Sequence, residues 1–359
     1  MKFFRNCAAS IAVATAIVAA PAVAPSDSGI QATASAATPV TKMEAMDITP
    51  DIAKMNWYKK TKNDPRVKLM QAKSPAMKGR KVPMVVIPAK TANRPTLYLL
   101  NGAGSGEQNT DWVSQSKVVD FYSKKNINVI IPMTGAFSYY TDWKYTPSGT
   151  YLKGPQKWET FMTKELPPAA ESHLRANNKR AVAGMSMSAT SALNFAQHNP
   201  GFYDAVGSFA GCAETSSPLG YQALRLTTQR GGSTPEKMWG KQGSRTNRYN
   251  DALLNAKKLR GHKLYISSAT GLASKTDMPS YYTKQGVHPA LAVAGSAQLQ
   301  IEGGVIEAAA NVCTHNLKAK LDSLGINARY NFRNTGTHSW PGWREDMVKS
   351  WPTFAAAFR

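Results

Sequence analysis

RAVAGMSMSATSALNFA, residues 180–196, joins a short apolar run to an alanine-rich stretch through the sequence Gly-Met-Ser-Met-Ser. The run from Ala181 to Ala183 predicts a buried strand, and the small residues after Ser186 predict a helix. Residues 184–188 nearly match the G-x-S-x-G turn, in which a strained backbone holds a serine between a strand and a helix. We therefore predict that Ser186 is a nucleophile; the alternative is an ordinary serine in a serine-rich chain.

Strand-like and helix-like segments alternate around this turn. Apolar runs predict strands within residues 81–100, 126–133, 180–186, 203–211, 262–270 and 326–334, and helical spacing predicts helices within 157–176 and 189–200. This alternation predicts an α/β fold with a mostly parallel central sheet flanked by helices. Residues 37–70 are polar and basic, which predicts a lead-in outside the core. Residues 213–260 and 280–305 lack a clear period, so we expect insertions over the active-site end of the sheet.

A serine hydroxyl needs a base before it can act as a nucleophile. In folds with this turn, an acid and then a histidine follow the serine along the chain. His338 lies in NTGTHSWPGW, directly after the last predicted strand, and is the expected base. The other histidines after residue 200 occupy a strand start, an insertion and a helix-like stretch: His262, His288 and His315.

The acid is expected in the loop after the strand at 262–270. Asp277 lies in this loop, where it would orient the imidazole and stabilise its cation. Glu302 is the alternative, and Glu307 follows it in the chain. The predicted catalytic residues are thus Ser186, His338 and Asp277.

Two backbone N–H groups are needed to bind the oxyanion. One should belong to Met187, the residue after the nucleophile, and the other to a loop after an early strand. LYLLNGAGSGEQ, residues 97–108, is that loop, because its apolar start is followed by glycines that allow close approach to an acyl oxygen. The alternatives are an ordinary glycine-rich turn and a phosphate-binding loop, and the missing Gly-Lys-Ser/Thr ending disfavours the phosphate-binding loop.

The first residues predict a secretory signal peptide. Lys2 and Arg5 precede an alanine-rich apolar run, and small residues allow cleavage after residue 36. The alternative, a membrane anchor, is disfavoured because the run is interrupted by serine and proline. We predict one domain over residues 37–359, located outside the cell in the envelope. There Cys212 and Cys313 could form a disulfide; two buried free thiols are the alternative.

The chain carries a formal net charge of +22, which suits an anionic partner. No nucleic-acid motif occurs, so an anionic envelope surface is the favoured partner, and a charge that only maintains solubility is the alternative. No H-x₃-H or C-x₂-C spacing occurs, and we predict neither a metal nor a cofactor.

Several stretches in order resemble the secreted mycolyltransferases of the antigen 85 type and their corynebacterial relatives, which have the α/β-hydrolase fold. They are SPAMKGRKVPMVV (74–86), LYLLNGAG (97–104), VIIPMTGAFSYYTDW (129–143), KWETFMTKELP (157–167), GMSMSATSA (184–192) and NTGTHSW (334–340). The resemblance implies transfer of a mycolyl chain from trehalose monomycolate to trehalose or cell-wall arabinogalactan, through an acyl-serine. A carboxylesterase and a non-catalytic wall-binding protein are the alternatives.

The resemblance also implies roles for single residues. Ala103 and Met187 would be the oxyanion donors, and Asp277 falls near the family acid, which is usually a glutamate. Asn101 and Gly104 stand where the family has an acid and an arginine that contact the sugar. Ser339 and Trp340, beside the histidine, are retained, and with Asn101 they are the expected substrate contacts.

Overall fold

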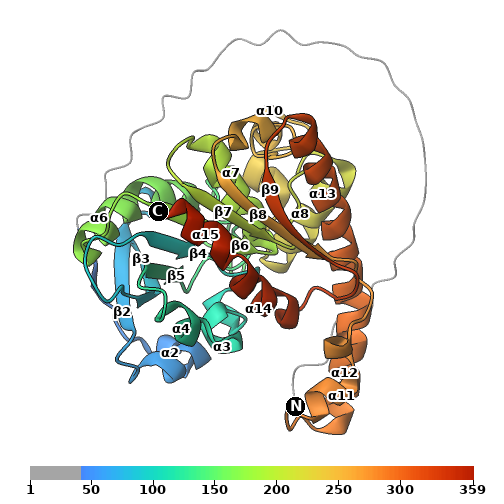
Figure 1. Ribbon diagram of the computed structural model, residues 1–359, viewed down its shortest axis with the longest axis horizontal. Helices are drawn as coiled ribbons and strands as arrows, with labels where there is room; N and C mark the ends of the chain where they lie inside the picture. Colours follow the sequence, from blue (N-terminus) through green and yellow to red (C-terminus); the bar gives the residue numbers. More distant parts are fainter. Residues whose placement is uncertain (1–41) are drawn as a thin grey trace. The chain divides into compact units, whose positions relative to one another are not determined.

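One nine-stranded sheet organises residues 42–359, with the strand order β1-β2-β3-β5-β4-β6-β7-β8-β9 (Figure 1). This structure is a computed structural model that describes those residues, so the predicted signal peptide at 1–36 lies outside the described part. The strands are β1 (Glu44–Ala45), β2 (Lys68–Ser74), β3 (Arg80–Ile87), β4 (Thr96–Leu99), β5 (Asn128–Pro132), β6 (Arg180–Met185), β7 (Ala205–Phe209), β8 (Lys263–Ala269) and β9 (Ala328–Arg333).

The strands from β5 to β9 are parallel, whereas β1, β2 and β3 form an antiparallel edge that pairs with β5. The predicted mostly parallel sheet is therefore confirmed. Every residue of β5 is buried, since both faces of the sheet are covered at this point.

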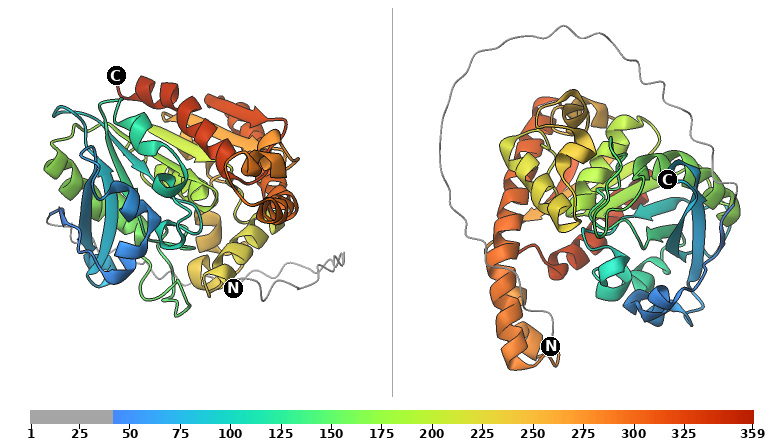
Figure 2. Two further views of the ribbon diagram at one scale, coloured as in Figure 1. Left: turned by 90° about the horizontal axis from the view of Figure 1, so that it is seen from below. Right: turned by 180° about the vertical axis from the view of Figure 1, so that it is seen from behind.

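Helices connect the strands and cover both faces of the sheet (Figures 1 and 2). They are α1 (Pro50–Lys54), α2 (Asn56–Thr61), α3 (Trp112–Gln115), α4 (Val118–Tyr122), α5 (Trp158–Thr160), α6 (Leu166–Leu174), α7 (Met187–His198), α8 (Pro218–Arg230), α9 (Pro235–Trp239), α10 (Arg245–Tyr249), α11 (Pro279–Thr283), α12 (Pro289–Gln298), α13 (Gly304–Ser323), α14 (Trp340–Lys349) and α15 (Trp351–Ala357). Among the helices of residues 42–359, none combines the length and the apolar character that crossing a bilayer requires.

Two separate cores stabilise the two faces. Leu166 of α6 and Leu317 of α13 belong to one core, whereas Trp112 of α3, Tyr122 of α4 and Phe354 of α15 belong to the other. Each fully buried side chain of this size contributes about 1.5–3 kcal/mol relative to an exposed one. The sheet is thus a rigid base for the loops at its carboxyl edge.

The predicted helix at 157–176 is present, but it contains a π-helical turn, η3 (Phe161–Glu165), between α5 and α6. Pro167 and Pro168 follow this turn. A proline offers no N–H to the carbonyl four residues earlier and clashes with it, which explains why the helix widens here. Phe161 and Leu166 are fully buried.

The prediction that residues 37–70 lie outside the core is wrong. Trp57 of α2 is only 2% exposed, and its indole N–H donates to the carbonyl of Gly106 at 3.2 Å. This stretch also supplies β1 and the start of β2. Polar and basic neighbours, among them Lys59 and Lys60 of α2, concealed the few buried residues in the sequence.

The two predicted insertions contain helices. Residues 213–260 form α8, α9, α10 and a 3₁₀ turn, η4 (Ala256–Leu259). Residues 280–305 include α11, α12 and a π-helical turn, η6 (Leu299–Gly303). We call residues 279–303 the helical arm, because α11, α12 and η6 extend away from the sheet before α13 begins (Figures 1 and 2).

We predict that Trp57→Ala lowers the free energy of unfolding by about 3–5 kcal/mol, because it leaves a cavity beside the loop after β4. Urea-induced unfolding measures this change. Lys59→Ala, on the exposed side of α2, is the control and should stay within about 0.5 kcal/mol of wild type. A loss of less than 1 kcal/mol for Trp57→Ala would contradict a core role for this segment.

Candidate active site

Ser186 occupies a strained turn between β6 and α7. Its backbone has φ 57° and ψ −125°, a conformation that residues with a side chain rarely adopt. The turn is held because the Ser186 N–H donates to the carbonyl of Phe209 in β7 at 2.8 Å. A Cβ atom on Gly184 would lie 2.3 Å from the carbonyl oxygen of Ser188, so only glycine fits there. Strand and helix therefore meet at a sharp turn with the serine at its apex.

Ser188 replaces the second glycine of the motif and closes the turn from inside. Its hydroxyl accepts from the N–H of Met185 and donates to the carbonyl of Met185, both at 3.0 Å. The side chain is fully buried. The departure from the motif thus adds two hydrogen bonds at the end of β6.

His338 lies beside the serine hydroxyl. Its Nε2 is 2.7 Å from Ser186 Oγ, which is within the reach needed for proton transfer. The imidazole packs edge-to-face on Trp343, with 5.0 Å between the ring centroids. The structure thus brings together two predicted site residues that are far apart in the sequence.

The carboxylate that contacts His338 belongs to Glu307, in the first turn of α13. Glu307 Oε2 lies 2.7 Å from His338 Nδ1, and Oε1 accepts from the N–H of Ala269, at the end of β8, at 2.6 Å. The Glu307 side chain is 1% exposed. A buried carboxylate at Nδ1 fixes the tautomer and leaves Nε2 free to accept the serine proton.

The expectation that Asp277 contacts the imidazole is not met. Its carboxylate accepts hydrogen bonds from Ser274, Thr337 and Ser339 instead. Glu302, the alternative, is exposed and accepts from the side chain of Gln298. The acid was expected in the loop after β8. Instead, the chain first forms the helical arm, and α13, which follows the arm, supplies the carboxylate. The one available signal was the glutamate usual in the resembling family.

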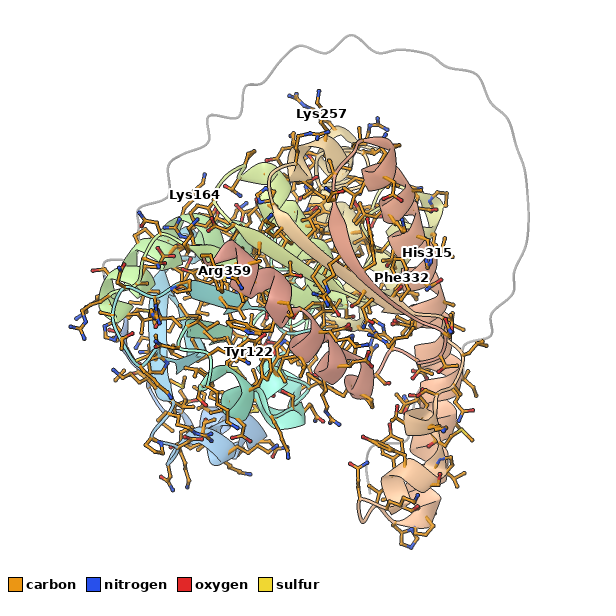
Figure 3. All side chains as sticks on the ribbon, viewed as in Figure 1. Tyr122, Lys164, Lys257, His315, Phe332 and Arg359 are labelled. Atoms are coloured by element: carbon orange, nitrogen blue, oxygen red, sulfur yellow. A yellow bond between two sulfur atoms is a disulfide. The ribbon has the colours of Figure 1, made fainter. Side chains whose placement is uncertain are left out.

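The other histidines after residue 200 make contacts elsewhere. His315 of α13 stacks on Phe332 of β9, with ring centroids 4.3 Å apart (Figure 3). His262 is buried, and its Nδ1 lies 2.7 Å from the carbonyl oxygen of Tyr203. His288 is the exposed residue that precedes α12.

The backbone N–H groups of Ala103 and Met187 are suited to bind an oxyanion. Met187 is the first residue of α7, whose N–H has no acceptor within the helix, and the helix dipole adds positive potential there. Ala103 belongs to the loop after β4 and lines the same cavity as Ser186. Within residues 42–359, neither N–H has a hydrogen-bond acceptor. An oxygen of a bound ester could therefore accept from both.

The expectation that Asn101 contacts substrate is wrong. Asn101 is fully buried, its Nδ2 donates to the carbonyl of Pro132 at 2.8 Å, and its Oδ1 accepts from the N–H of Trp112 at 3.0 Å. Both ends of the amide are therefore used to fix the loop after β4. Ser339 and Trp340 do line the cavity beside His338.

A cavity of about 690 Å³ opens from Ser186 and His338. Its walls come from α8, the helical arm and α13, and most of the side chains are apolar, among them Leu219, Leu226, Leu299, Val305 and Ile306. A volume of this size with few polar groups fits an extended hydrocarbon chain. Both predicted insertions therefore contribute to the walls of the site.

The predicted disulfide between Cys212 and Cys313 is present in this wall. Cys212 follows β7 near the nucleophile turn, and Cys313 lies on α13 six residues after Glu307. The bond therefore ties the helix that carries Glu307 to the part of the sheet that carries Ser186.

The family model described as putative esterase matches residues 74–354. The diacylglycerol acyltransferase/mycolyltransferase Ag85A of Mycobacterium gordonae is 30% identical over 288 residues, which cover 77% of this chain and 76% of that protein. Ag85A of Mycobacterium tuberculosis (strain ATCC 25618 / H37Rv) is 29% identical over 283 residues, with 77% of each chain covered.

Solved structures agree on the fold. MPT51 (FbpC1) of Mycobacterium tuberculosis superimposes with a TM-score of 0.66 at 21% identity, over 82% of this chain and 99% of that chain. An S-formylglutathione hydrolase from Agrobacterium tumefaciens gives a TM-score of 0.57 at 18% identity, over 81% and 96% of the two chains. The predicted α/β-hydrolase fold is confirmed.

We predict that Glu307→Gln lowers kcat by about 10³–10⁴-fold, because a neutral amide at Nδ1 permits the wrong tautomer of His338. Steady-state hydrolysis of a short p-nitrophenyl ester measures this effect. Glu302→Gln should retain most of the activity, since that carboxylate does not contact the imidazole. A larger loss in Glu302→Gln than in Glu307→Gln would contradict the assignment.

Ser188→Ala should lower the free energy of unfolding by about 1–3 kcal/mol, because the polar atoms of Met185 lose a buried partner. Thermal and urea unfolding measure the loss. The exposed Ser323→Ala is a matched control that removes one surface hydroxyl of α13. Equal stability of the two variants would show that Ser188 does not brace the turn.

Proposed function

Because the chain belongs to the putative esterase family, and within it to the mycolyltransferases of the antigen 85 type, we propose that it is a serine acyltransferase of the cell envelope. It moves a mycolyl chain from trehalose monomycolate to trehalose or to cell-wall arabinogalactan. Residues 1–36 are removed as a signal peptide, and residues 37–359 form one catalytic domain. The observation that carries this proposal is the hydrogen-bonded series Ser186, His338 and Glu307 at the end of an apolar cavity.

The first half of the reaction acylates the serine. Ser186 Oγ attacks the ester carbonyl carbon while His338 Nε2 takes the hydroxyl proton, and the Glu307 carboxylate stabilises the imidazolium. The N–H groups of Ala103 and Met187 donate to the negatively charged oxygen of the tetrahedral intermediate. As the intermediate collapses, the carbon–oxygen bond to the sugar breaks, and the sugar oxygen receives the proton from His338.

The second half reverses these steps with a new alcohol. His338 removes the proton of the acceptor hydroxyl, whose oxygen attacks the acyl carbon and releases Ser186. An acceptor held close to the ester gains an effective molarity of about 10⁵ M or more over free water. The apolar walls of the cavity favour transfer because they hold the acyl chain and limit the access of water.

The second candidate is a carboxylesterase of the same fold, in which water is the acceptor. Asn101 is buried and Gly104 has no side chain, so the two sugar contacts that the resemblance implies are absent from this loop. Trehalose would then need contacts from the cavity walls, where Gln115, Gln222 and Arg344 are polar candidates. The acceptor decides between the two functions.

The net charge of +22 supports a location at an anionic envelope surface. In this proposal the charge holds the enzyme near its amphiphilic substrate, and the attraction falls as salt screens it.

We predict that Ser186→Ala reduces acyl transfer by about 10⁵–10⁶-fold while the protein keeps its fold. Purified protein is given trehalose monomycolate, and the lipid products are separated and identified by mass spectrometry. Circular dichroism checks the fold of the variant. Transfer by Ser186→Ala at the wild-type rate would contradict the acyl-serine mechanism.

We further expect trehalose to divert the acyl group of a short activated ester into a sugar ester. The ester is supplied with and without trehalose, and free acid and sugar ester are quantified. A product mixture of free acid alone at saturating trehalose would favour the carboxylesterase.

A further inference from the structure

Asp277 is a fully buried carboxylate that the proposed reaction does not use. Its Oδ1 accepts from Thr337 Oγ1 at 2.8 Å and from Ser339 Oγ at 3.0 Å. Its Oδ2 accepts from the N–H and the hydroxyl of Ser274, at 2.8 and 2.7 Å, and from the N–H of Thr337 at 3.3 Å. Five donors on one carboxylate are more than a local turn requires.

The partners of this carboxylate stand on both sides of His338. Thr337 precedes the histidine and Ser339 follows it, so one carboxylate binds the backbone N–H and hydroxyl of one neighbour and the hydroxyl of the other. Because the imidazole is attached to that backbone, its distance from Ser186 Oγ depends on where the two neighbours are held. Glu307 acts on the ring from Nδ1 and does not contact these neighbours.

Backbone hydrogen bonds join the same loop to the two ends of the helical arm. The N–H of Gly336 donates to the carbonyl of Leu272, before the arm, at 2.6 Å. The N–H of His338 donates to the carbonyl of Gly303, at the end of the arm, at 3.0 Å. These contacts hold the backbone at Gly336 and His338, and Asp277 adds the contacts to Thr337 and Ser339.

Burial would raise the pKa of Asp277, but the hydrogen bonds from Ser274, Thr337 and Ser339 lower it below the usual value. The carboxylate is therefore ionised at neutral pH. An ionised acceptor makes shorter and stronger hydrogen bonds than a neutral one.

We propose that Asp277 is a positioning residue for His338, which it holds at reacting distance from Ser186 through Thr337 and Ser339. This inference rests on the proposed function, because it concerns the base of that reaction. The two carboxylates then have different roles. Glu307 orients the imidazole ring, and Asp277 holds the loop residues on either side of His338. A displacement of about 1 Å in such a group can cost about 10²-fold in rate.

The test compares Asp277→Asn with wild type in the full mature chain. The amide turns an N–H₂ group toward at least one N–H or O–H donor, so the loop loses its common acceptor. We expect kcat for a p-nitrophenyl ester to fall by about 10–100-fold with KM changed by less than about twofold. Covalent labelling of Ser186 by a fluorophosphonate should slow by the same factor. If Asp277 contributed only to stability, its substitution would not lower kcat while leaving KM nearly unchanged.

Thr337→Val tests the same connection with a smaller change. It removes the hydroxyl donor and keeps the shape, and we expect a loss of kcat of about 3–10-fold. In the double variant with Asp277→Asn, the loss should be smaller than the product of the single losses, because both changes break one interaction. This variant also decides the question if Asp277→Asn does not fold.

Asp251→Asn is the matched control. Asp251 is 1% exposed and also accepts from the N–H and the hydroxyl of a serine, Ser216, at 2.8 and 2.5 Å. It makes no contact with the His338 loop. We expect this variant to lose thermal stability and to keep the wild-type kcat.

The outcomes separate this inference from the proposed function. The inference alone is overturned if the fluorophosphonate labels Ser186 in the wild type and labels Asp277→Asn and Thr337→Val at the same rate. An equal fall of kcat in Asp251→Asn and Asp277→Asn also overturns it. Wild-type protein that is not labelled at Ser186 overturns the proposed function and this inference with it.

Discussion

The 2.7 Å hydrogen bond between His338 Nε2 and Ser186 Oγ joins residues that are 152 positions apart. The length of this hydrogen bond depends on two separate parts of the structure. The turn between β6 and α7 places the hydroxyl, and the loop after β9 places the imidazole. Two strands of the parallel sheet, β7 and β8, lie between these supports, so the pairing of β6 to β9 sets the relative position of the two atoms. The geometry of the site therefore depends on the register of these strands.

Three tryptophans form an aromatic cluster beside His338. Trp112 and Trp343 both pack edge-to-face on Trp340, at 5.5 and 5.2 Å between ring centroids, and Trp343 packs on His338. The indole N–H of Trp112 donates to the carbonyl of Leu100, at the start of the oxyanion loop. One aromatic cluster therefore contacts the base and the oxyanion loop together. Aromatic pairs of this geometry contribute about 0.5–1.5 kcal/mol each beyond the area they bury.

The sequence predicts those features that depend on local pattern. The apolar runs predict β5 to β9, and the turn motif and chain order bring Ser186 and His338 together. The residue pattern does not predict Glu307 as the acid. Its position depends on where the chain returns to the sheet after the insertion at 280–305, and hydrophobic periodicity does not indicate that point. Trp57 was missed because one buried indole among lysines leaves no pattern. The resemblance predicts that Asn101 contacts substrate. Only the packing of the loop after β4 shows that its amide points inward.

The helical arm connects the acyl cavity with the base. Side chains of the arm, such as Leu299, form part of the cavity wall. The arm begins two residues after Asp277 and ends four residues before Glu307. Asp277 contacts the His338 loop, and Glu307 contacts the imidazole. A change that moves either end of the arm therefore alters the shape of the cavity and the position of the imidazole at once. In the proposed reaction, one segment would therefore influence both the choice of acyl chain and the rate of its transfer.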